Sequence, residues 1–443
     1  MGDYELCDVC MEGVTLINEF ITSQKTFADI KPHAINLCVK VLTKKGYHGD
    51  YMCPGIVESY GPGTWFVFVQ LSLDPLTVCE KLNYCLPSMG LWKTTGERKV
   101  EADYNPHRLV PDRVVPREAG DELSGTEKIL RILQLSDIHV DPYYTTGAAT
   151  DCGLYICCRS QFNGTGSAGQ YGNYDCCDIP VRTLDIVLSA IRKLDPAPDF
   201  IIYTGDSPPH DVWQESWDSQ LKADSLVVQR LNEQLEGFTI YPAIGNHESY
   251  PESFYYQPST AYQALNSKLA TLWGSWFNVS ADQRESIEIS AYYTTLVRPG
   301  LRILSFNTDY GYLANFYFLL NDRIPAYREQ QQFMKDVLAG ARQSNEKVII
   351  IGHVPPGDKG SSVMDYGDFY TDLAVNYSDV IVLHLFGHTH HDEFELVSAC
   401  FLYLDSEIFL SEGKTDVKLL YSAKDEYGLS DMSPQSWRSL SDR

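Results

Sequence analysis

Seven side chains that can bind metal ions each follow a short apolar run of the sequence. The runs are KILRILQLSD, DFIIYTGD, TIYPAIGNHE, KVIIIGH and DVIVLHLFGHTH. The side chains that these runs deliver, in chain order, are Asp137, His139, Asp206, Asn246, His353, His388 and His390. Carboxylate, imidazole and amide ligands without a thiolate suit zinc, manganese or iron better than calcium or magnesium. Two such ions clamp the attacking and leaving oxygens of a phosphoryl group, so the pattern indicates phosphoester chemistry.

These residues need a scaffold that gathers them, and the apolar runs predict one. Several of the runs are rich in β-branched residues, and helix-like stretches such as VRTLDIVLSAIRKL and REQQQFMKDVL lie between some of them. Alternating strands and helices predict an α/β domain with a largely parallel, buried sheet. Ligands bind at the carboxyl ends of strands in such sheets, so we expect the seven side chains to converge on one edge of the sheet. Glycine before several of them permits a tight turn and close backbone approach.

The motif order D-x-H, GD, GNH, GH and GHxH resembles the signature of the calcineurin-like metallophosphoesterases. The resemblance implies a double-sheet sandwich flanked by helices, with two zinc ions. It also implies phosphodiester hydrolysis by attack of a hydroxide that bridges the two ions. In this family pattern one ion takes Asp137, His139 and His390, the other takes Asn246, His353 and His388, and Asp206 bridges them.

Two further histidines lie beside these motifs. His247 follows Asn246, and we predict that it is the general acid, because an alkoxide leaving group needs a proton and imidazolium is populated at acid pH. His210 lies in GDSPPHDVW, four residues after Asp206, and we predict that it contacts the phosphate. The alternative for His210 is a loop histidine without a role. Glu248 either orients His247 or is a surface carboxylate.

The first 88 residues form a separate unit that is marked by six cysteines. Cys7, Cys10, Val14, Ile17 and Ile21 recur at spacings of three and four, which predicts one stripe of an amphipathic helix. The cysteine pattern resembles a saposin B-type domain, a small all-α fold. The resemblance implies the bridges Cys7–Cys85, Cys10–Cys79 and Cys38–Cys53, whereas spacing alone leaves about 15 connectivities open. It also implies contact with lipid; the alternative is a disulfide-linked helical bundle with no lipid role.

The combination of the two units resembles the acid sphingomyelinase family, and GDSPPHDVW, YPAIGNHES, IIGHVPPGD and FGHTHHDEFEL carry the resemblance. It implies hydrolysis of sphingomyelin to ceramide and phosphocholine at a membrane surface that the saposin-like unit contacts. DCGLYICCRS and CDIPVRTL are similar too, which implies bridges Cys152–Cys157 and Cys158–Cys177 and leaves Cys176 and Cys400 unassigned. Two alternatives remain: a general or nucleotide phosphodiesterase, or a catalytically silent variant that binds lipid.

The silent variant is an alternative because the end of the chain differs from the family pattern. After DEFEL the sequence resembles only part of the family's helical C-terminal region. We therefore predict four segments: a saposin B-type lipid-interacting domain at 1–88, a proline-containing linker at 89–126, a metallophosphoesterase catalytic domain at 127–410, and a remnant of the C-terminal helical region at 411–443.

Charge and cysteine content limit the partners and the compartment. The chain has 35 Lys and Arg against 59 Asp and Glu, a net charge of −24, which does not suit nucleic acid. Its 12 cysteines, with the glycosylation sequons at Asn163, Asn278 and Asn376, favour an oxidising compartment, either lysosomal or secreted. The opening MGDYELCDVC has no signal-peptide pattern, so we expect a start that is processed or incomplete. The sequence carries no indication of the oligomeric state.

Overall fold

The computed structural model describes residues 3–71, 74–82, 84–85, 130–174, 176–358, 360–391, 396–397 and 401–404. The predicted linker 89–126, the predicted remnant 411–443 and Cys400 lie outside the described residues. The predicted segment boundaries therefore stay predictions.

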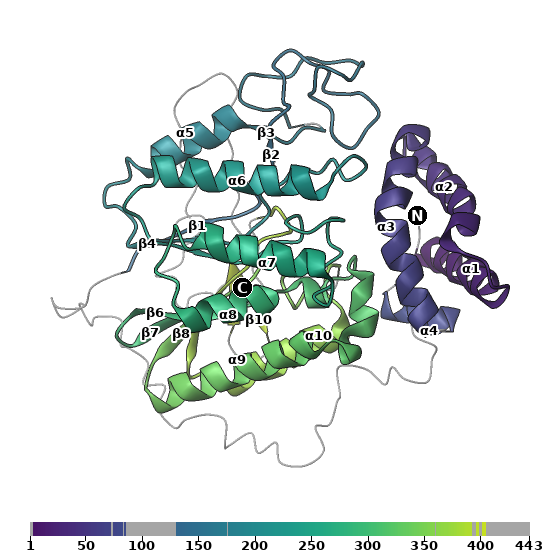
Figure 1. Ribbon diagram of the computed structural model, residues 1–443. Coiled ribbons are helices and arrows are strands. Elements are labelled where there is room, and N and C mark those ends of the chain that lie inside the picture. Colours follow the sequence, from purple (N-terminus) through teal and green to yellow (C-terminus); the bar gives the residue numbers. More distant parts are fainter. Residues whose placement is uncertain are drawn as a thin grey trace, which may run out of the picture.

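Four helices form the N-terminal unit, drawn in purple in Figure 1. They are α1 (Asp3–Thr22), α2 (Phe27–Lys44), α3 (Gly49–Leu71) and α4 (Pro75–Lys81). Helix α4 begins as a capped helix should, because Asp74 accepts a hydrogen bond from the Thr77 amide and Pro75 occupies the first turn. The bridges Cys7–Cys85, Cys10–Cys79 and Cys38–Cys53 that the saposin resemblance implies are all present.

The part of the chain that is predicted to be catalytic, from residue 130 on, is called the catalytic part below. It contains two main sheets and thus confirms the predicted double-sheet α/β class. The three-stranded sheet is parallel, in the order β1 (Ile132–Leu135), β4 (Phe200–Tyr203) and β5 (Ile240–Pro242). The six-stranded sheet has the order β10-β11-β9-β8-β7-β6. Its strands are β6 (Tyr293–Arg298), β7 (Leu301–Ser305), β8 (Lys347–Ile351), β9 (Ile381–Leu385), β10 (Leu396–Val397) and β11 (Phe401–Leu404). A small pair, β2 (Val140–Asp141) and β3 (Ile179–Pro180), lies beside them.

The expectation of a single sheet edge is therefore wrong. Strands β1, β4 and β5 belong to one sheet, whereas β8 and β9 belong to the other. The apolar runs look alike in the sequence because strands of both sheets are buried: β4 is buried along its whole length, and β8 everywhere except at Lys347. Periodicity predicts burial of a strand but not the sheet that it joins.

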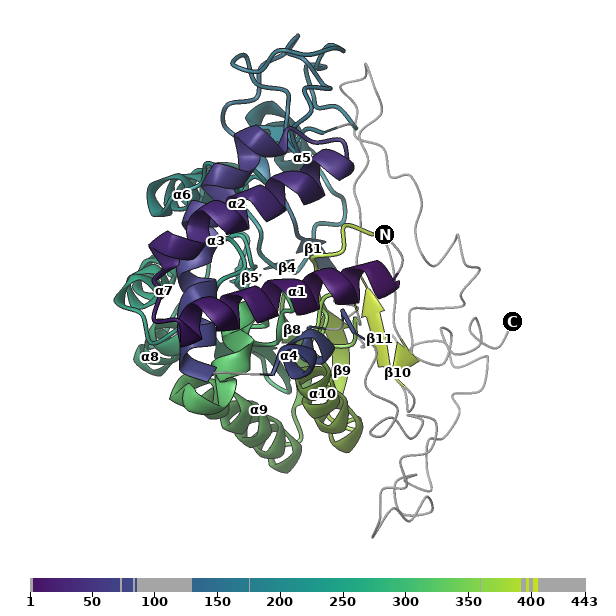
Figure 2. The same cartoon turned by 90° about the vertical axis from the view of Figure 1, so that its right-hand side faces the viewer.

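Helices cover the outer faces of the sheets (Figures 1 and 2). Those of the catalytic part are α5 (Val181–Ile191), α6 (Trp217–Gln234), α7 (Thr260–Trp273), α8 (Ala281–Ser290), α9 (Pro325–Gln343) and α10 (Met364–Asn376), with 3-10 turns η1 (Asp309–Gly311) and η2 (Phe316–Arg323). The stretch VRTLDIVLSAIRKL forms α5 up to Ile191, and REQQQFMKDVL lies in α9, as predicted. No helix in the described ranges has the length and apolar character that crossing a bilayer requires.

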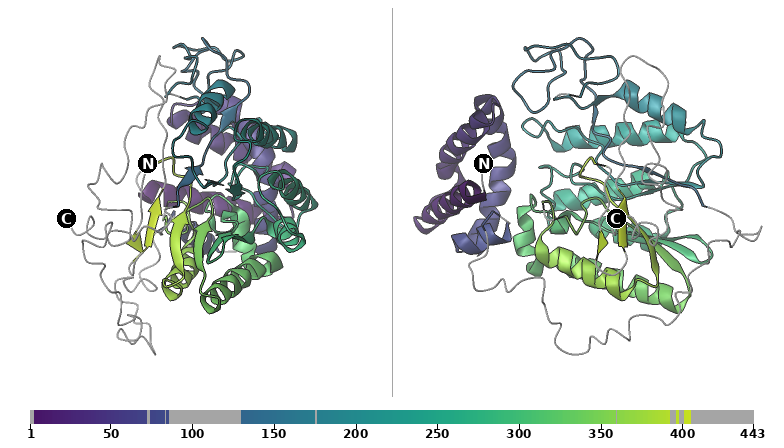
Figure 3. Two further views of the ribbon diagram at one scale, coloured as in Figure 1. Left: turned by 90° about the vertical axis from the view of Figure 1, so that its left-hand side faces the viewer. Right: turned by 180° about the vertical axis from the view of Figure 1, so that it is seen from behind.

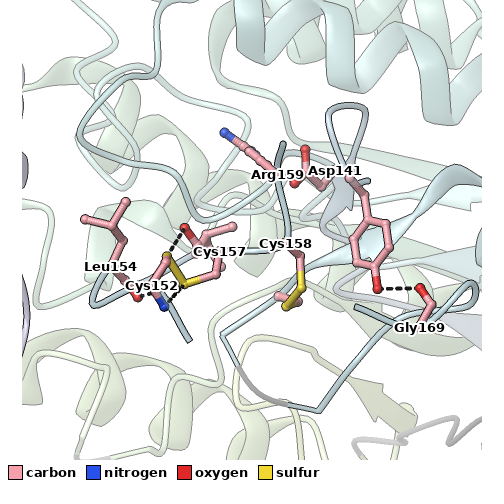
Figure 4. The surroundings of a disulfide bond; sticks show 10 residues. Asp141, Cys152, Leu154, Cys157, Cys158, Arg159 and Gly169 are labelled. Atoms are coloured by element: carbon pink, nitrogen blue, oxygen red, sulfur yellow. Dashed lines mark hydrogen bonds and ion pairs between the residues drawn. A yellow bond between two sulfur atoms is a disulfide. The ribbon is translucent and has the colours of Figure 1, made fainter. Parts of the chain in front are cut away.

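A loop held by two disulfides follows β2 (Figure 4). The bridges Cys152–Cys157 and Cys158–Cys177 are those that the family resemblance implies. Beside them the guanidinium of Arg159, which is only 1% exposed, donates from Nε to Asp141 Oδ2 and from Nη1 to Asp211 Oδ2, both at 2.7 Å. These two buried ion pairs connect the disulfide loop to Asp141, which follows the first motif, and to Asp211, which follows the second.

The helical unit lies at one side of the catalytic part, with α3 nearest to it in both Figure 1 and Figure 3. Backbone contact is direct, since the amide of His48 donates to the carbonyl of Gly153 at 2.7 Å. The cysteine stripe predicts a helix where α1 lies, whereas no sequence pattern predicts α3.

Candidate metal centre

The seven predicted ligands lie together beyond the carboxyl ends of strands from both sheets. Groups of their ligand atoms, with those of two neighbouring histidines, lie within 4.8 Å of one another: His139–His210–His390, His139–Asp206–His247 and Asp206–His353–His388. Residues that are far apart in the sequence thus form one polar cluster.

The ligands that the family pattern gives to one ion are in mutual contact. Nε2 of His139 lies 3.0 Å from Nε2 of His390, and the latter atom lies 3.3 Å from Oδ1 of Asp137. The ligands of the other ion form the second half of the cluster. There Nδ1 of His388 lies 2.9 Å from Oδ1 of Asn246.

Asp206 lies between the two halves, as expected of a bridging carboxylate. Its Oδ2 is 2.9 Å from Nε2 of His353 and 3.6 Å from Nε2 of His139. Its Oδ1 accepts a hydrogen bond from the backbone amide of His247 at 2.9 Å. Asp206 is 1% exposed, so nothing but these neighbours solvates its charge.

The backbone at the ligands is held in an unusual conformation. Five of the seven ligand residues have positive φ: Asp137, His139, Asp206, His388 and His390, at 51°, 41°, 62°, 81° and 57°. Positive φ in residues other than glycine is strained and concentrates at functional sites. The glycines beside them allow close approach, because a Cβ on Gly205 would lie 2.4 Å from the Gly245 amide nitrogen.

Hydrogen bonds outside the cluster fix which atoms face inward. Nδ1 of His139 contacts the carbonyl oxygen of Pro208 at 2.8 Å, and Nδ1 of His353 contacts that of Thr204 at 2.7 Å. A carbonyl only accepts, so each Nδ1 carries a proton and each Nε2 is the atom that faces the cluster, where the neutral imidazole offers a lone pair. Asn246 donates from Nδ2 to Glu252 Oε1 at 2.5 Å, which turns its amide oxygen inward as well.

This collection of inward-facing acceptor atoms fits a site for cations. Burial opposes ionisation of Asp206, but neighbouring His353 and His247 lower its pKa well below the ordinary value. Burial would lower the pKa of His353, yet Asp206 and Asp137 raise it to about 10. The proton that these carboxylates hold on Nε2 of His353 lies where a divalent cation would bind, since a histidine must be neutral to ligate a metal.

The two histidines predicted to act on substrate lie at the side of the cluster, in contact with its ligands. The ring of His210 lies 3.8 Å from that of His139 and 4.6 Å from that of His247, between centroids. Burial would lower the pKa of His210, but Asp178, whose Oδ1 lies 2.8 Å from Nδ1, raises it to about 9. Burial lowers the pKa of His247, and its Nδ1 has no hydrogen-bond partner among the described residues.

Two glutamates near the third motif have roles that the sequence does not reveal. Glu248 neither orients His247 nor lies on the surface. It is 4% exposed, and its carboxylate accepts the backbone amides of Asp206, Ser207 and Gly245 at 2.7–3.1 Å. Glu252, which anchors Asn246, belongs to no recognisable motif. Asp178, the partner of His210, likewise has no sequence signal.

Comparison with known proteins identifies the family of the chain that carries this cluster. The family model described as "Calcineurin-like phosphoesterase" matches residues 130–392, well over half of the chain. "Sphingomyelin phosphodiesterase A" of Dictyostelium discoideum is 30% identical over 99% of this chain and 82% of its own length. "Sphingomyelin phosphodiesterase" of Homo sapiens is 30% identical over 88% of this chain, which spans 60% of that protein. A cyclic GMP-AMP phosphodiesterase of Bos taurus is 31% identical over 60% of this chain and 58% of its own length.

The match covers every predicted ligand, and the relatives include one whose similarity runs through the helical unit and the catalytic part alike. The chain therefore belongs to the calcineurin-like phosphoesterases and, within them, to the family of the sphingomyelin phosphodiesterases.

Proposed function

We propose that this chain is a two-zinc phosphodiesterase that hydrolyses sphingomyelin to ceramide and phosphocholine. The observation that carries the proposal is the cluster of inward-facing acceptor atoms with two further histidines beside it. The substrate is supported by similarity over 99% of the chain to a sphingomyelin phosphodiesterase, which includes the helical unit. The cyclic GMP-AMP phosphodiesterase matches only 60% of the chain.

In this proposal one cation is held by Asp137, His139 and His390, the other by Asn246, His353 and His388, and Asp206 is shared. Histidine and carboxylate ligands without thiolate suit zinc. When bound, two divalent cations lower the pKa of a water molecule and neutralise charge on the phosphoryl oxygens.

The remaining chemistry belongs to the two other histidines. His210 carries the charge to contact a phosphoryl oxygen, because Asp178 keeps its imidazole protonated. His247 donates a proton to the departing alkoxide of ceramide, and its buried Nδ1 is uncommitted in the described structure. Burial lowers the pKa of His247, so its acid form is favoured at acid pH, which suits an acidic compartment.

The helical unit is the proposed contact with the membrane surface. Large side chains with apolar surface are exposed on it: Leu37, Val69 and Tyr84. A lysosomal or secreted location agrees with its bridges, since disulfides persist in oxidising compartments. Glycosylation agrees with the sequon asparagines, since Asn163, Asn278 and Asn376 are all exposed.

The decisive experiment uses purified full-length chain. Metal content is measured by mass spectrometry, and release of phosphocholine from sphingomyelin vesicles is followed at about pH 5. We expect two zinc ions per chain and turnover that a chelator abolishes and zinc restores. Zinc-replete protein that does not hydrolyse sphingomyelin would overturn the proposal.

A nucleotide phosphodiesterase is the second candidate, because the cyclic GMP-AMP phosphodiesterase is similar over the catalytic part. Cyclic dinucleotide and sphingomyelin are therefore compared in the same assay. A higher kcat/KM for the nucleotide would favour this candidate. Protein that binds sphingomyelin vesicles but hydrolyses neither substrate would be the silent lipid-binding variant.

A further inference from the structure

Helix α3 packs against the catalytic part at unusually short distance. Gly55, Ser59 and Gly63 recur every four residues and so lie on one face of the helix. A Cβ on Gly55 would lie 1.8 Å from the carbonyl oxygen of Trp213, and one on Gly63 would lie 2.7 Å from the hydroxyl of Tyr317. The backbone of the helix therefore approaches its neighbour closely, and Figures 1 and 3 show from opposite sides that α3 is the helix that faces the catalytic part.

Tyr60, next to this face, reaches toward the metal centre. Its hydroxyl donates a hydrogen bond to Oε2 of Glu252 at 3.1 Å. Its ring meets Phe254 edge to face, with the centroids 5.1 Å apart. The helical unit thus supplies a hydrogen-bond donor to a carboxylate of the catalytic part.

Glu252 connects that donor to the cluster. Its Oε1 accepts Asn246 Nδ2 at 2.5 Å and lies 3.5 Å from Nε2 of His247. Its backbone amide donates to Oε1 of the buried Glu215 at 2.9 Å, which holds the loop in place. One carboxylate oxygen therefore faces the helical unit and the other faces a proposed ligand and the proposed acid.

We propose that Tyr60 is a positioning residue: its hydroxyl fixes the Glu252 carboxylate, and Glu252 in turn orients the Asn246 amide and the His247 imidazole. The proposal rests on the proposed function for the reaction that these residues serve. It makes docking of the helical unit part of the assembly of the catalytic site, in addition to any contact with lipid.

Glu252 can orient Asn246 because a side-chain amide carries an acceptor oxygen on one side and a donor nitrogen on the other. Asn246 presents its oxygen inward while Nδ2 is held by Glu252 and, at 3.3 Å, by the hydroxyl of Ser253, which also donates to Oε1 of Glu252. A carboxylate that loses the hydrogen bond to its other oxygen is less firmly held in the orientation that meets Nδ2. Partners of this kind, one step removed from a metal, change metal affinity or activity by about 10- to 100-fold when they are lost. We expect the lower end for Tyr60, which is two hydrogen bonds from the cluster.

The test compares Tyr60→Phe with Tyr51→Phe in the full-length chain. Both variants lose one hydroxyl from α3, and Tyr51 also packs edge to face on the catalytic part, at Phe162, while 52% exposed. The substrate is bis(p-nitrophenyl) phosphate, which is soluble, so membrane binding does not contribute. Zinc affinity is measured separately, by competition of the metal-free protein with a chromophoric chelator.

For Tyr60→Phe we expect kcat to fall by about 10-fold with little change in KM, and zinc affinity to fall by a similar factor. Tyr51→Phe should match the wild type in all three quantities. Wild-type kcat and zinc affinity in Tyr60→Phe would overturn the proposal. An equal loss in both variants would also overturn it, since that would mean general loosening of the interface.

A double-mutant cycle with Glu252→Ala tests whether Tyr60 acts on zinc affinity through Glu252. If Tyr60 acts through Glu252, adding Tyr60→Phe to Glu252→Ala should change zinc affinity less than about twofold. A further 10-fold loss would overturn the proposed route. The zinc titration also tests Tyr60 if the wild type hydrolyses no phosphodiester, an outcome that would reject the proposed function but not this positioning role.

Discussion

The catalytic part and the helical unit hold their shapes by different means. Strand β4 is buried at every position, and the catalytic sheets lie within one continuous apolar core. The helices of the helical unit, by contrast, bury few side chains. Among the residues whose burial is described, α1 buries Val14 and α2 buries Ile30, while α3 buries more residues than either. The difference indicates that the helical unit depends more than the catalytic part on its bridges and on docking through α3, which shares the apolar core through Val67 and Phe68.

The largest expected effect of a single substitution lies in the catalytic part, at Asp206, the proposed bridging carboxylate. Asp206→Ala should abolish zinc binding and lower kcat/KM by at least about 1000-fold, because both cations lose a shared ligand. Metal analysis and a phosphodiester assay measure the two effects. Asp218→Ala, at a carboxylate that is 77% exposed, is the control and should leave both unchanged.

Removal of the buried guanidinium of Arg159 should destabilise the catalytic part. Arg159→Ala leaves Asp141 and Asp211 without their partner, which we expect to lower the free energy of unfolding by about 3–5 kcal/mol. Arg342→Ala, where the side chain is 44% exposed and paired with Asp379, should cost about 1 kcal/mol or less. Urea titration measures both; equal losses would mean that the buried pair is not special.

Docking through α3 is tested at its closest contact. Gly55→Ala adds a Cβ against the Trp213 carbonyl and should destabilise the chain by up to about 3 kcal/mol. Hydrogen exchange should then accelerate in α3. Gly13→Ala, in α1 with no atom within 4 Å, should instead stabilise by about 0.5–1 kcal/mol. If both substitutions stabilise the chain, α3 is not packed as closely as described.

A smaller effect, on the pH dependence of stability, is expected at His384 in β9. Burial lowers the pKa of His384 to about 3, and its Nδ1 lies 2.5 Å from the Tyr370 hydroxyl. The unfolded histidine binds a proton near its ordinary pKa of about 6.5, so stability is lost as pH falls from there toward 3. His384→Asn should reduce the loss between pH 7 and pH 5 by about 2 kcal/mol. Urea titrations at both pH values measure it, and His33→Asn, at an exposed residue, should not change it.

The cluster of candidate metal ligands was predictable because each of its residues stands in a short motif beside a buried strand. The five polar strand ends lie together, even though they come from two sheets and not from one edge as expected. Local sequence predicts that a strand is buried, whereas the pairing of β8 with β7 and β9 depends on the whole domain.

The docking helix was not predictable in the same way. Helix α3 contains Pro54, Pro62 and several glycines, which disfavour a helix locally, and tertiary packing overrides that preference. Its partner Glu252 was missed because a carboxylate between Pro251 and Ser253 looks like any loop residue. Contacts between distant segments leave no periodic signal in either of them.

The left-handed backbone at Asp137, His139, Asp206, His388 and His390 has a consequence for how such a centre changes over generations. Each of these conformations costs about 1–3 kcal/mol and persists only while its surroundings enforce it. Loss of one ligand would remove part of that enforcement, and neighbouring turns would be free to relax. Selection should therefore keep the five positions as a block or release them together, and a lineage that drops one would be expected to lose the others soon after.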